Sequence, residues 1–261
     1  MAKYIKYKNI NIHYSDSGEG KPIVLLHGFL ENLKMWDELS KVLQSKCRVI
    51  SIDLLGHGQT ECLGYIHTME EMAEAVKSVL NHLNLTQYCL IGHSMGGYVA
   101  LTICEKYGDE IIGLCLANST SQSDSEERKL NRDRAVEAVK MNPKTFINVL
   151  ISNLFRPKNR TLFSEEIKAL KEEAYKMKVQ GIIAAIEGMK IRKNREEVLK
   201  NSPFNKMMII GTKDPILNPD HLLNEIKNTD VVCVELADGH MSYIENKEEF
   251  TYNIMHFIEK L

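Results

Sequence analysis

Short apolar runs separated by amphipathic segments constrain the fold of this chain more than any other feature of its sequence. Runs of this kind occupy residues 23–26, 49–52, 89–91, 111–116, 207–210 and 231–234. Nearly continuous apolar character is typical of parallel strands that are buried on both faces of a sheet. We therefore expect an α/β fold with a mostly parallel sheet and helices on both faces.

The segments around these runs support the same expectation. Residues 4–8 and 10–14 alternate between apolar and polar, which predicts an antiparallel hairpin at a sheet edge. Thr68 to Glu71 matches a capping box, so we expect a helix from there to about Leu85. Near the C-terminus, one helical face carries Phe250, Ile254, Phe257, Ile258 and Leu261.

The alternation of strands and helices stops between about residues 121 and 203, where only helical patterns occur. Ser164 is a candidate helix cap, and two apolar stripes follow it, namely Ile167, Leu170, Ala174 and Met177, then Ile182, Ile183, Ile186 and Met189. This stretch holds 18 Lys/Arg and 12 Asp/Glu, a balance of +6, whereas the rest of the chain has a balance of −8. We expect residues 1–120 and 204–261 to form the core and residues 121–203 to form an inserted helical cap.

Length and composition exclude several classes of protein. A chain of 261 residues with a net charge of −2 fits one large α/β domain and has no basic excess that would indicate nucleic-acid binding. The N-terminus lacks the apolar stretch of a signal peptide, and no run approaches the roughly 20 apolar residues that span a bilayer. The six cysteines form no Cys-x-x-Cys pair, and most lie in apolar runs as small core residues. These features predict a cytoplasmic protein with no nucleic-acid or membrane partner.

The sequence Gly92-His93-Ser94-Met95-Gly96-Gly97 joins the apolar run 89–91 to a helical pattern. Gly-x-Ser-x-Gly at a strand-to-helix junction is typical of a nucleophile elbow, a turn so tight that glycines must flank the serine. The turn exposes the serine hydroxyl, and the following helix directs backbone N–H groups towards developing negative charge. The alternative is a glycine-rich turn that makes a tight bend and nothing more.

A serine nucleophile needs a histidine base and usually an acid that orients it. In this kind of fold the order along the chain is serine, acid, histidine, each after a later strand. Asp214 follows the run 207–210, and His240 follows the run 231–234 in Gly239-His240. The rival acids are Asp124 and Asp238. This chemistry predicts neither a metal nor an organic cofactor.

An oxyanion hole would complete the site. One donor should be the backbone N–H of Met95, and the other should come from the loop after an earlier strand. His27-Gly28-Phe29 is such a loop, so Phe29 is the candidate donor. Four further side chains are candidates for the acyl pocket, and ordinary packing explains each of them equally well: Leu30, Trp36, His93 and Tyr98.

These motifs together resemble the α/β-hydrolase fold superfamily, in particular its small bacterial carboxylesterase-like members with a helical cap. The resemblance rests on His27-Gly28-Phe29, Asp53-Leu54-Leu55-Gly56-His57-Gly58, Gly92 to Gly97, Gly211-Thr212-Lys213-Asp214 and Gly239-His240 in this order. It implies Ser94 as nucleophile, Asp214 as acid, His240 as base, and Phe29 and Met95 as oxyanion donors. The implied substrate is a small ester or related acyl compound.

The resemblance leaves several reactions open. Haloalkane dehalogenases and epoxide hydrolases are similar but carry an aspartate where this chain has Ser94. Esterases, enol-lactonases, C–C bond hydrolases and a menaquinone-pathway lyase share the motifs. The lyase branch usually has arginine directly after Ser-x-Gly-Gly, where this chain has Tyr98. A non-catalytic ligand-binding protein on the same fold is the alternative of another class.

The start of the expected cap is rich in basic residues, Arg128, Lys129, Arg132 and Arg134. Helical spacing places Arg128 and Arg132 on one face and directs Arg134 elsewhere. If that face meets the cleft, the guanidinium groups would attract an anionic substrate. A solvated helix exterior explains the same charges.

Overall fold

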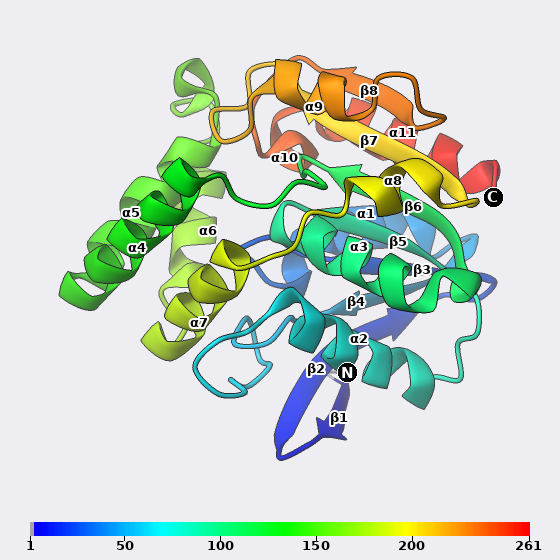
Figure 1. Cartoon of the computed structure of the whole chain (residues 1–261), viewed down its shortest axis with the longest axis horizontal. Helices are drawn as coiled ribbons and strands as arrows, with labels where there is room; N and C mark the ends of the chain where they lie inside the picture. Colours follow the sequence, from blue (N-terminus) through cyan, green and yellow to red (C-terminus); the bar gives the residue numbers. More distant parts are fainter. Residues whose placement is uncertain (1–2) are drawn as a thin grey trace.

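The computed structural model describes residues 3–261, and these residues form one eight-stranded sheet (Figure 1). The strand order is β1-β2-β4-β3-β5-β6-β7-β8. Strand β2 pairs antiparallel with β1 and β4, and the remaining neighbours are parallel. The mostly parallel α/β fold expected from the sequence is confirmed. The strands are β1 Lys3–Tyr7, β2 Ile10–Ser17, β3 Lys21–Leu26, β4 Cys47–Ile52, β5 Tyr88–His93, β6 Ile111–Ala117, β7 Asn205–Gly211 and β8 Val232–Leu236.

The helices connect the strands and cover both faces of the sheet, as Figure 1 shows. Within the described part of the chain they are α1 Asp37–Leu43, α2 Met69–His82, α3 Met95–Tyr107, α4 Glu126–Met141, α5 Pro143–Leu154, α6 Ser164–Ala174, α7 Val179–Lys190, α8 Glu196–Asn201, α9 Pro219–Glu225, α10 Ser242–Glu245 and α11 Lys247–Glu259. None of the helices in residues 3–261 combines the length and the apolar character that crossing a membrane requires.

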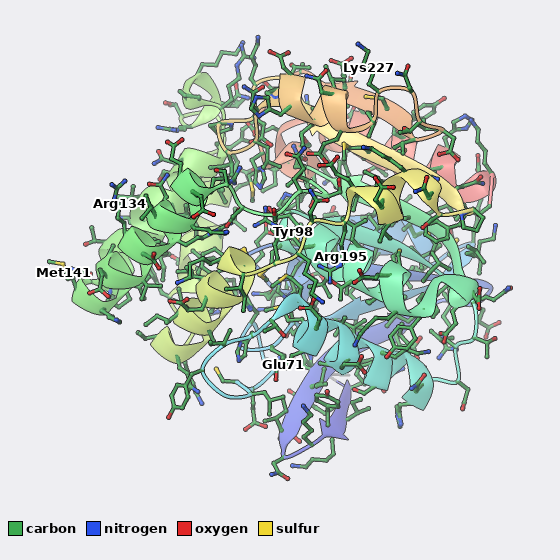
Figure 2. All side chains as sticks on the ribbon, viewed as in Figure 1. Glu71, Tyr98, Arg134, Met141, Arg195 and Lys227 are labelled. Atoms are coloured by element: carbon green, nitrogen blue, oxygen red, sulfur yellow. The ribbon has the colours of Figure 1, made fainter. Side chains whose placement is uncertain are left out.

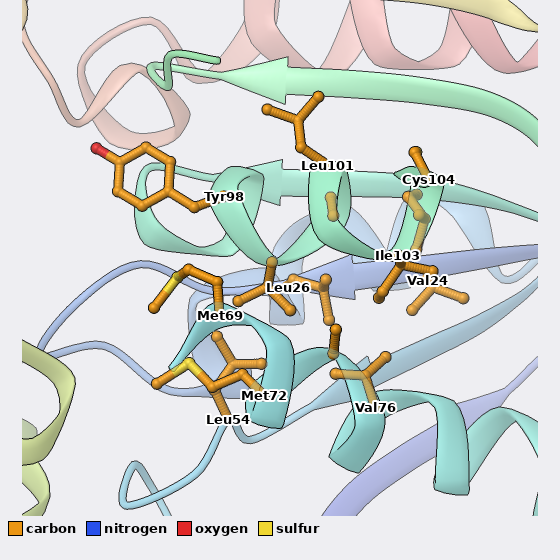
Figure 3. Packing of buried hydrophobic residues seen from close by; sticks show 14 of the residues in the cluster. Val24, Leu26, Leu54, Met69, Met72, Val76, Tyr98, Leu101, Ile103 and Cys104 are labelled. Carbon is orange, nitrogen blue, oxygen red and sulfur yellow. The ribbon is translucent and has the colours of Figure 1, made fainter. Parts of the chain in front are cut away.

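Strand β3 shows why the central runs must be apolar throughout. Val24 and Leu26 pack into a cluster with α2 and α3 on one face of the sheet (Figure 3). Ile23 and Leu25 pack on the other face with side chains of α1 and α11. Successive side chains of a strand point to opposite faces, so a strand covered on both sides has no position left for a polar residue.

Strand β8 differs from the expectation for the run 231–234. It lies at the end of the sheet, and Val232 is 52% exposed. Cys233 is also exposed, so it is not one of the small core residues that the sequence suggested. The apolar composition was typical of a central strand, but position in the sheet is decided by the packing of the whole chain.

Two helix starts test the capping signals. Thr68 caps α2, its side chain accepting a hydrogen bond from the Glu71 N–H at 3.0 Å, although the helix ends at His82 rather than near Leu85. Ser164 does not cap α6: it is the first helical residue, and Phe163 occupies the cap position with no side-chain bond.

Helices α4 to α7 form a layer of their own beside the sheet, at the left of Figure 1. We call residues 126–190 the helical layer. Its interior is apolar, with side chains of α4, α5, α6 and α7 in one cluster. Helix α8 also falls within the expected insertion 121–203, but Leu199 joins the cluster of the sheet and the helix packs on α3.

Helix α7 docks on the core through close backbone contacts. A Cβ atom on Gly181 would collide with the backbone of Gly56, and one on Gly188 would collide with the carbonyl group of His67. The His67 N–H also donates to the Ala184 carbonyl oxygen at 2.9 Å. This end of the helical layer is therefore fixed to the loop between β4 and α2.

Candidate active site

Ser94 occupies a strained turn between β5 and α3. Its φ of 48° lies in the left-handed region, which is costly for a residue with a side chain. The turn is held by the Ser94 N–H, which donates to the Ala117 carbonyl oxygen at 2.9 Å, and by the Ser119 hydroxyl, which donates to the Ser94 carbonyl oxygen at 2.7 Å. A Cβ atom on Gly96 would collide with the Leu26 carbonyl group, so only glycine fits there. Strain and close approach agree with the geometry of a nucleophile elbow.

Three side chains from separate loops meet at this turn. The Ser94 Oγ lies 2.9 Å from His240 Nε2, and His240 Nδ1 lies 2.7 Å from Asp214 Oδ2. Because Nδ1 faces a carboxylate, it carries the proton, and Nε2 is free to accept the hydroxyl proton of Ser94. Each residue follows the carboxyl end of a parallel strand, β5, β7 or β8, where ligands of such sheets bind.

The Asp214 carboxylate is fixed on both oxygens. Its Oδ1 accepts from the N–H groups of Ile216 at 2.8 Å and Leu217 at 3.0 Å. Burial alone would raise the pKa of Asp214, but His240 and these N–H donors lower the pKa below its usual value. Asn118 adds a donor, since its Nδ2 lies 3.3 Å from Asp214 Oδ2 and 3.2 Å from the Gly239 carbonyl oxygen. The carboxylate is thus ionised and held in one orientation.

The two rival acids are engaged elsewhere. Asp238 lies 2.9 Å from Arg156 and also accepts from Asn246. Asp124 is fully buried and is bound by arginine side chains, among them Arg192 at 2.5 Å. Neither carboxylate contacts His240.

The two backbone N–H groups predicted as oxyanion donors are those of Met95 and Phe29. Met95 is the first residue of α3, and its N–H has no acceptor inside the helix. The Phe29 N–H, in the loop after β3, has no acceptor among residues 3–261. Leu30 adopts a φ of 64° in this loop, and the Glu31 N–H closes it by donating to the Gly28 carbonyl oxygen at 3.3 Å.

A buried ion pair that no sequence motif predicted supports this loop. Glu31 Oε2 accepts from the Gly28 N–H at 2.7 Å and lies 2.8 Å from His93 Nδ1. The Tyr243 hydroxyl donates to Glu31 Oε1 at 2.9 Å. Burial would lower the pKa of His93, but the Glu31 carboxylate raises the pKa above its usual value. Because Nδ1 faces Glu31 and Nε2 faces the His240 carbonyl oxygen, both nitrogens must donate, so His93 is a cation whose ring nitrogens are not free to bind a substrate.

A narrow cavity of about 80 Å³ opens above Ser94 and His240. Tyr98 and His93 line it as expected, together with Phe29, Leu150, Leu154, Met189 and Ile216. Figure 2 shows Tyr98 at the centre of the molecule, between the helical layer and the core. The walls are mainly apolar and come from both parts, so a substrate would be enclosed between them.

Two side chains expected in the acyl pocket lie outside this cavity. Trp36 is fully buried and packs against Tyr243 and Phe250 under α11. Leu30 is directed into the apolar interior of the helical layer. Both stand close to Phe29 in sequence, but their side chains leave the loop in other directions. No group of three or more His, Cys, Asp or Glu side chains within residues 3–261 is arranged to hold a metal ion.

A serine on a strained strand-to-helix turn, within reach of a histidine and an acid from later loops of a mostly parallel sheet, defines the α/β-hydrolase class. A family model described as alpha/beta hydrolase fold matches residues 21–247, and the chain belongs to this family.

Known proteins similar to this chain include esterases. It is 29% identical to a thermophilic esterase from Thermogutta terrifontis, solved with malate bound, with a TM-score of 0.92 over 100% of this chain and 98% of that one. An enol-lactonase from Burkholderia xenovorans LB400 is 21% identical, with a TM-score of 0.90 over 98% of this chain and 100% of that one, and shares the fold.

One curated relative is longer. The chain is 26% identical over 253 residues to the dihydrolipoyllysine-residue acetyltransferase component of the acetoin cleaving system of Pseudomonas putida. The match covers 92% of this chain but 64% of the length of that protein.

Proposed function

We propose that this protein is a serine hydrolase that cleaves a small ester or related acyl substrate through an acyl-enzyme on Ser94. The observation that carries the proposal is the continuous hydrogen-bonded series from Ser94 Oγ to His240, 2.9 Å, and from His240 to Asp214, 2.7 Å. A ligand-binding protein would need neither this series nor the strained turn beneath it.

The reaction follows from the positions of these atoms. His240 Nε2 takes the proton of Ser94 as the oxygen bonds to the substrate carbonyl carbon, and the carbonyl electron pair moves onto its oxygen. The N–H groups of Phe29 and Met95 stabilise that oxyanion, and one such donor is typically worth about 2.7–4 kcal/mol in the transition state. When the intermediate collapses, the leaving alkoxide takes the proton from His240 Nε2. Water then repeats the sequence on the acyl-enzyme and releases the acid.

The Asp214 carboxylate acts through His240 in this scheme. It keeps the proton on Nδ1 and stabilises the imidazolium that forms when Nε2 accepts the serine proton. The network from Asn118, Ile216 and Leu217 fixes the carboxylate before the substrate arrives. No metal or organic cofactor enters these steps.

The helical layer acts as a cap over the site in this proposal. Leu150, Leu154 and Met189 from α5 and α7 form the wall opposite Ser94, and the cavity of about 80 Å³ favours a short acyl or alcohol group. Likeness to an esterase at 29% identity supports ester hydrolysis, and the enol-lactonase makes a lactone a worthwhile second substrate to assay.

A fluorophosphonate probe tests the proposal directly. We expect the probe to label Ser94, identified by mass spectrometry, and to leave Ser94→Ala unlabelled. The same variant should lose at least about a thousandfold in turnover of an activated short-chain ester while keeping its unfolding midpoint. A Ser94→Ala protein that keeps a tenth of the activity would refute the assignment of the nucleophile.

A further inference from the structure

We propose that the substrate carries a carboxylate, bound by Arg128 and Arg132 at the mouth of the cavity that contains Ser94. This inference rests on the proposed ester hydrolysis and assigns the class of substrate. Its first support is position. Both arginines line the cavity of Ser94, and both also line a wider one of about 380 Å³ that shares residues of α4 and α5 with it. A molecule entering from the wider space would pass beside their side chains.

The two side chains share one face of α4 because they are four residues apart. Their neighbours Lys129 and Arg134 do not line either cavity. Lys129 pairs with Glu126 at 2.7 Å, and the exposed side chain of Arg134 donates to Asn131, at the rim of the wider cavity, at 3.0 Å. Figure 2 shows Arg134 and Met141 at the outer edge of the helical layer. The basic residues of α4 thus divide into two that face the site and others that face solvent.

The second support is an excess of positive charge. A single carboxylate, Asp124, is shared by three guanidinium groups, at 3.4 Å from Arg128, 3.0 Å from Arg132 and 2.5 Å from Arg192. The contacts of Arg128 and Arg132 use Nε. Within residues 3–261 their terminal NH1 and NH2 groups donate to no protein acceptor. These groups are the ones that bind a carboxylate in a forked geometry.

The other charges facing this region do not cancel the excess. Glu31 is paired with the His93 cation, and the ionised Asp214, beside a neutral His240, is buried behind that ring and lines neither cavity. Glu127 lines only the wider cavity and is exposed to solvent, where its charge is screened. The three guanidinium groups still outnumber the two carboxylates, Asp124 and Glu127, by one charge. This excess matches a singly charged carboxylate.

Apolar residues beside the two arginines strengthen their attraction for an anion. Phe29, Leu150 and Ile216 line both cavities beside the two arginines. Apolar walls exclude water and strengthen the attraction between a guanidinium and an anion. A substrate bound here would place its carboxylate at the mouth and its ester carbonyl at Ser94, so the arginines fix its direction as well as its affinity.

A matched pair of esters tests the proposal. The first is the 4-nitrophenyl half-ester of adipic acid, which ends in a free carboxylate, and the second is 4-nitrophenyl methyl adipate, which ends in a neutral methyl ester. The measured quantity is the ratio of kcat/KM for the acid to kcat/KM for the neutral ester, from release of nitrophenolate. We expect a ratio of at least about ten at low ionic strength, falling severalfold in ~0.5 M salt, because the contact is electrostatic and partly exposed.

Variants assign the preference to the two arginines. Arg128→Gln and Arg132→Gln should each lower the ratio about tenfold, and Arg132→Lys should keep part of it because the charge remains. Arg134→Gln, on the outer side of the same helix, should leave the ratio at the wild-type value. If a glutamine variant fails to fold, the salt dependence of the wild-type ratio still decides the question.

The outcomes separate this inference from the proposed function. Equal kcat/KM for the two esters in the wild-type protein would overturn the carboxylate site and leave the serine hydrolase intact. No turnover of either ester together with no labelling of Ser94 by a fluorophosphonate would overturn the proposed function itself. A stronger preference for a phosphonate-ended ester of the same length would replace the carboxylate by a doubly charged anion and so contradict the proposal.

Discussion

The Nε2 of His93 lies 3.0 Å from the backbone carbonyl oxygen of His240, so the residue before the serine supports the loop that carries the histidine. Its other ring nitrogen faces Glu31. Both contacts need a donor on His93, and only the imidazolium has a proton on each nitrogen. The Glu31–His93 pair therefore connects the loop of Phe29, the turn of Ser94 and the loop of His240.

Glu31→Gln is expected to disturb all three parts at once. Without the carboxylate, burial lowers the pKa of His93, and a neutral ring donates from one nitrogen instead of two. Breaking a buried ion pair from one side typically costs about 3–5 kcal/mol, which denaturant unfolding will measure.

A double-mutant cycle with His93→Gln provides the control for Glu31→Gln. If the two residues act as a pair, the double variant should be more stable than the sum of the single losses predicts, by about 0.5–3 kcal/mol. Strictly additive losses would show that Glu31 and His93 act separately.

Asn118→Gly removes the amide that donates to Asp214 and Gly239 while accommodating the φ of 45° at this position. A hydrogen bond to a charged group is worth about 1.5–3 kcal/mol, so we expect kcat for an activated ester to fall about tenfold or more. KM should change little, because Asn118 is not among the residues that line the cavity. A change confined to KM would place Asn118 in substrate binding instead.

Gly96→Ala and Gly108→Ala form a matched pair for the elbow. The added Cβ would collide with the Leu26 carbonyl group at position 96, whereas nothing lies within 4 Å at position 108. We expect Gly96→Ala to abolish soluble expression or lower the unfolding midpoint by many degrees. Gly108 has a φ of −53°, so Gly108→Ala should be neutral or more stable by about 0.4–1 kcal/mol. Equal midpoints for the two variants would show that the turn is not tightly packed.

Burial lowers the pKa of His57 from 6.5 to about 3. Below pH 6.5 the unfolded chain takes up a proton that folded His57 does not, so stability is lost as the pH falls from 6.5 towards 3. Between pH 7 and pH 5 this one residue should cost about 2 kcal/mol of unfolding free energy.

His57→Gln should reduce the slope of stability against pH over that interval, measured by denaturant unfolding at several pH values. The reduction is partial, because burial also lowers the pKa of His67, to about 4. Replacing the exposed His256 by Gln is the control. An unchanged slope in His57→Gln would show that His57 becomes protonated without unfolding.

Much of the fold follows from local sequence. The runs at 23–26 and 89–91 are apolar without a break because both sides of their strands are covered, and that pattern can be read directly. The position of a strand at the edge of the sheet cannot be predicted in this way, because it depends on how the whole chain packs. Val232 of the edge strand β8 is apolar and yet exposed.

The candidate site likewise contains residues that could be predicted from the sequence and residues that could not. Ser94, Asp214 and His240 were identified because each follows a strand in the required order, and the structure brings their side chains into hydrogen-bonding distance, while their role in catalysis stays a prediction. Glu31 and Asn118 were missed because their importance lies in contacts with residues 62 and 96 positions away. Trp36 was misplaced because neighbours in a loop need not share a direction.

The glycine contacts of α7 mean that the helices of the helical layer do not tolerate substitution equally. Any side chain larger than hydrogen at Gly181 or Gly188 would push α7 off the loop that follows β4. Helix α4 makes no backbone hydrogen bond to the core within residues 3–261, and it contributes Arg128 and Arg132 to the cavity. Helix α5 is held at its end, because the Leu154 carbonyl oxygen accepts from the His240 N–H at 3.0 Å. Mutations in α4 can therefore change which substrates this protein selects while α5 and α7 keep the layer attached, so new preferences can arise without rebuilding the core.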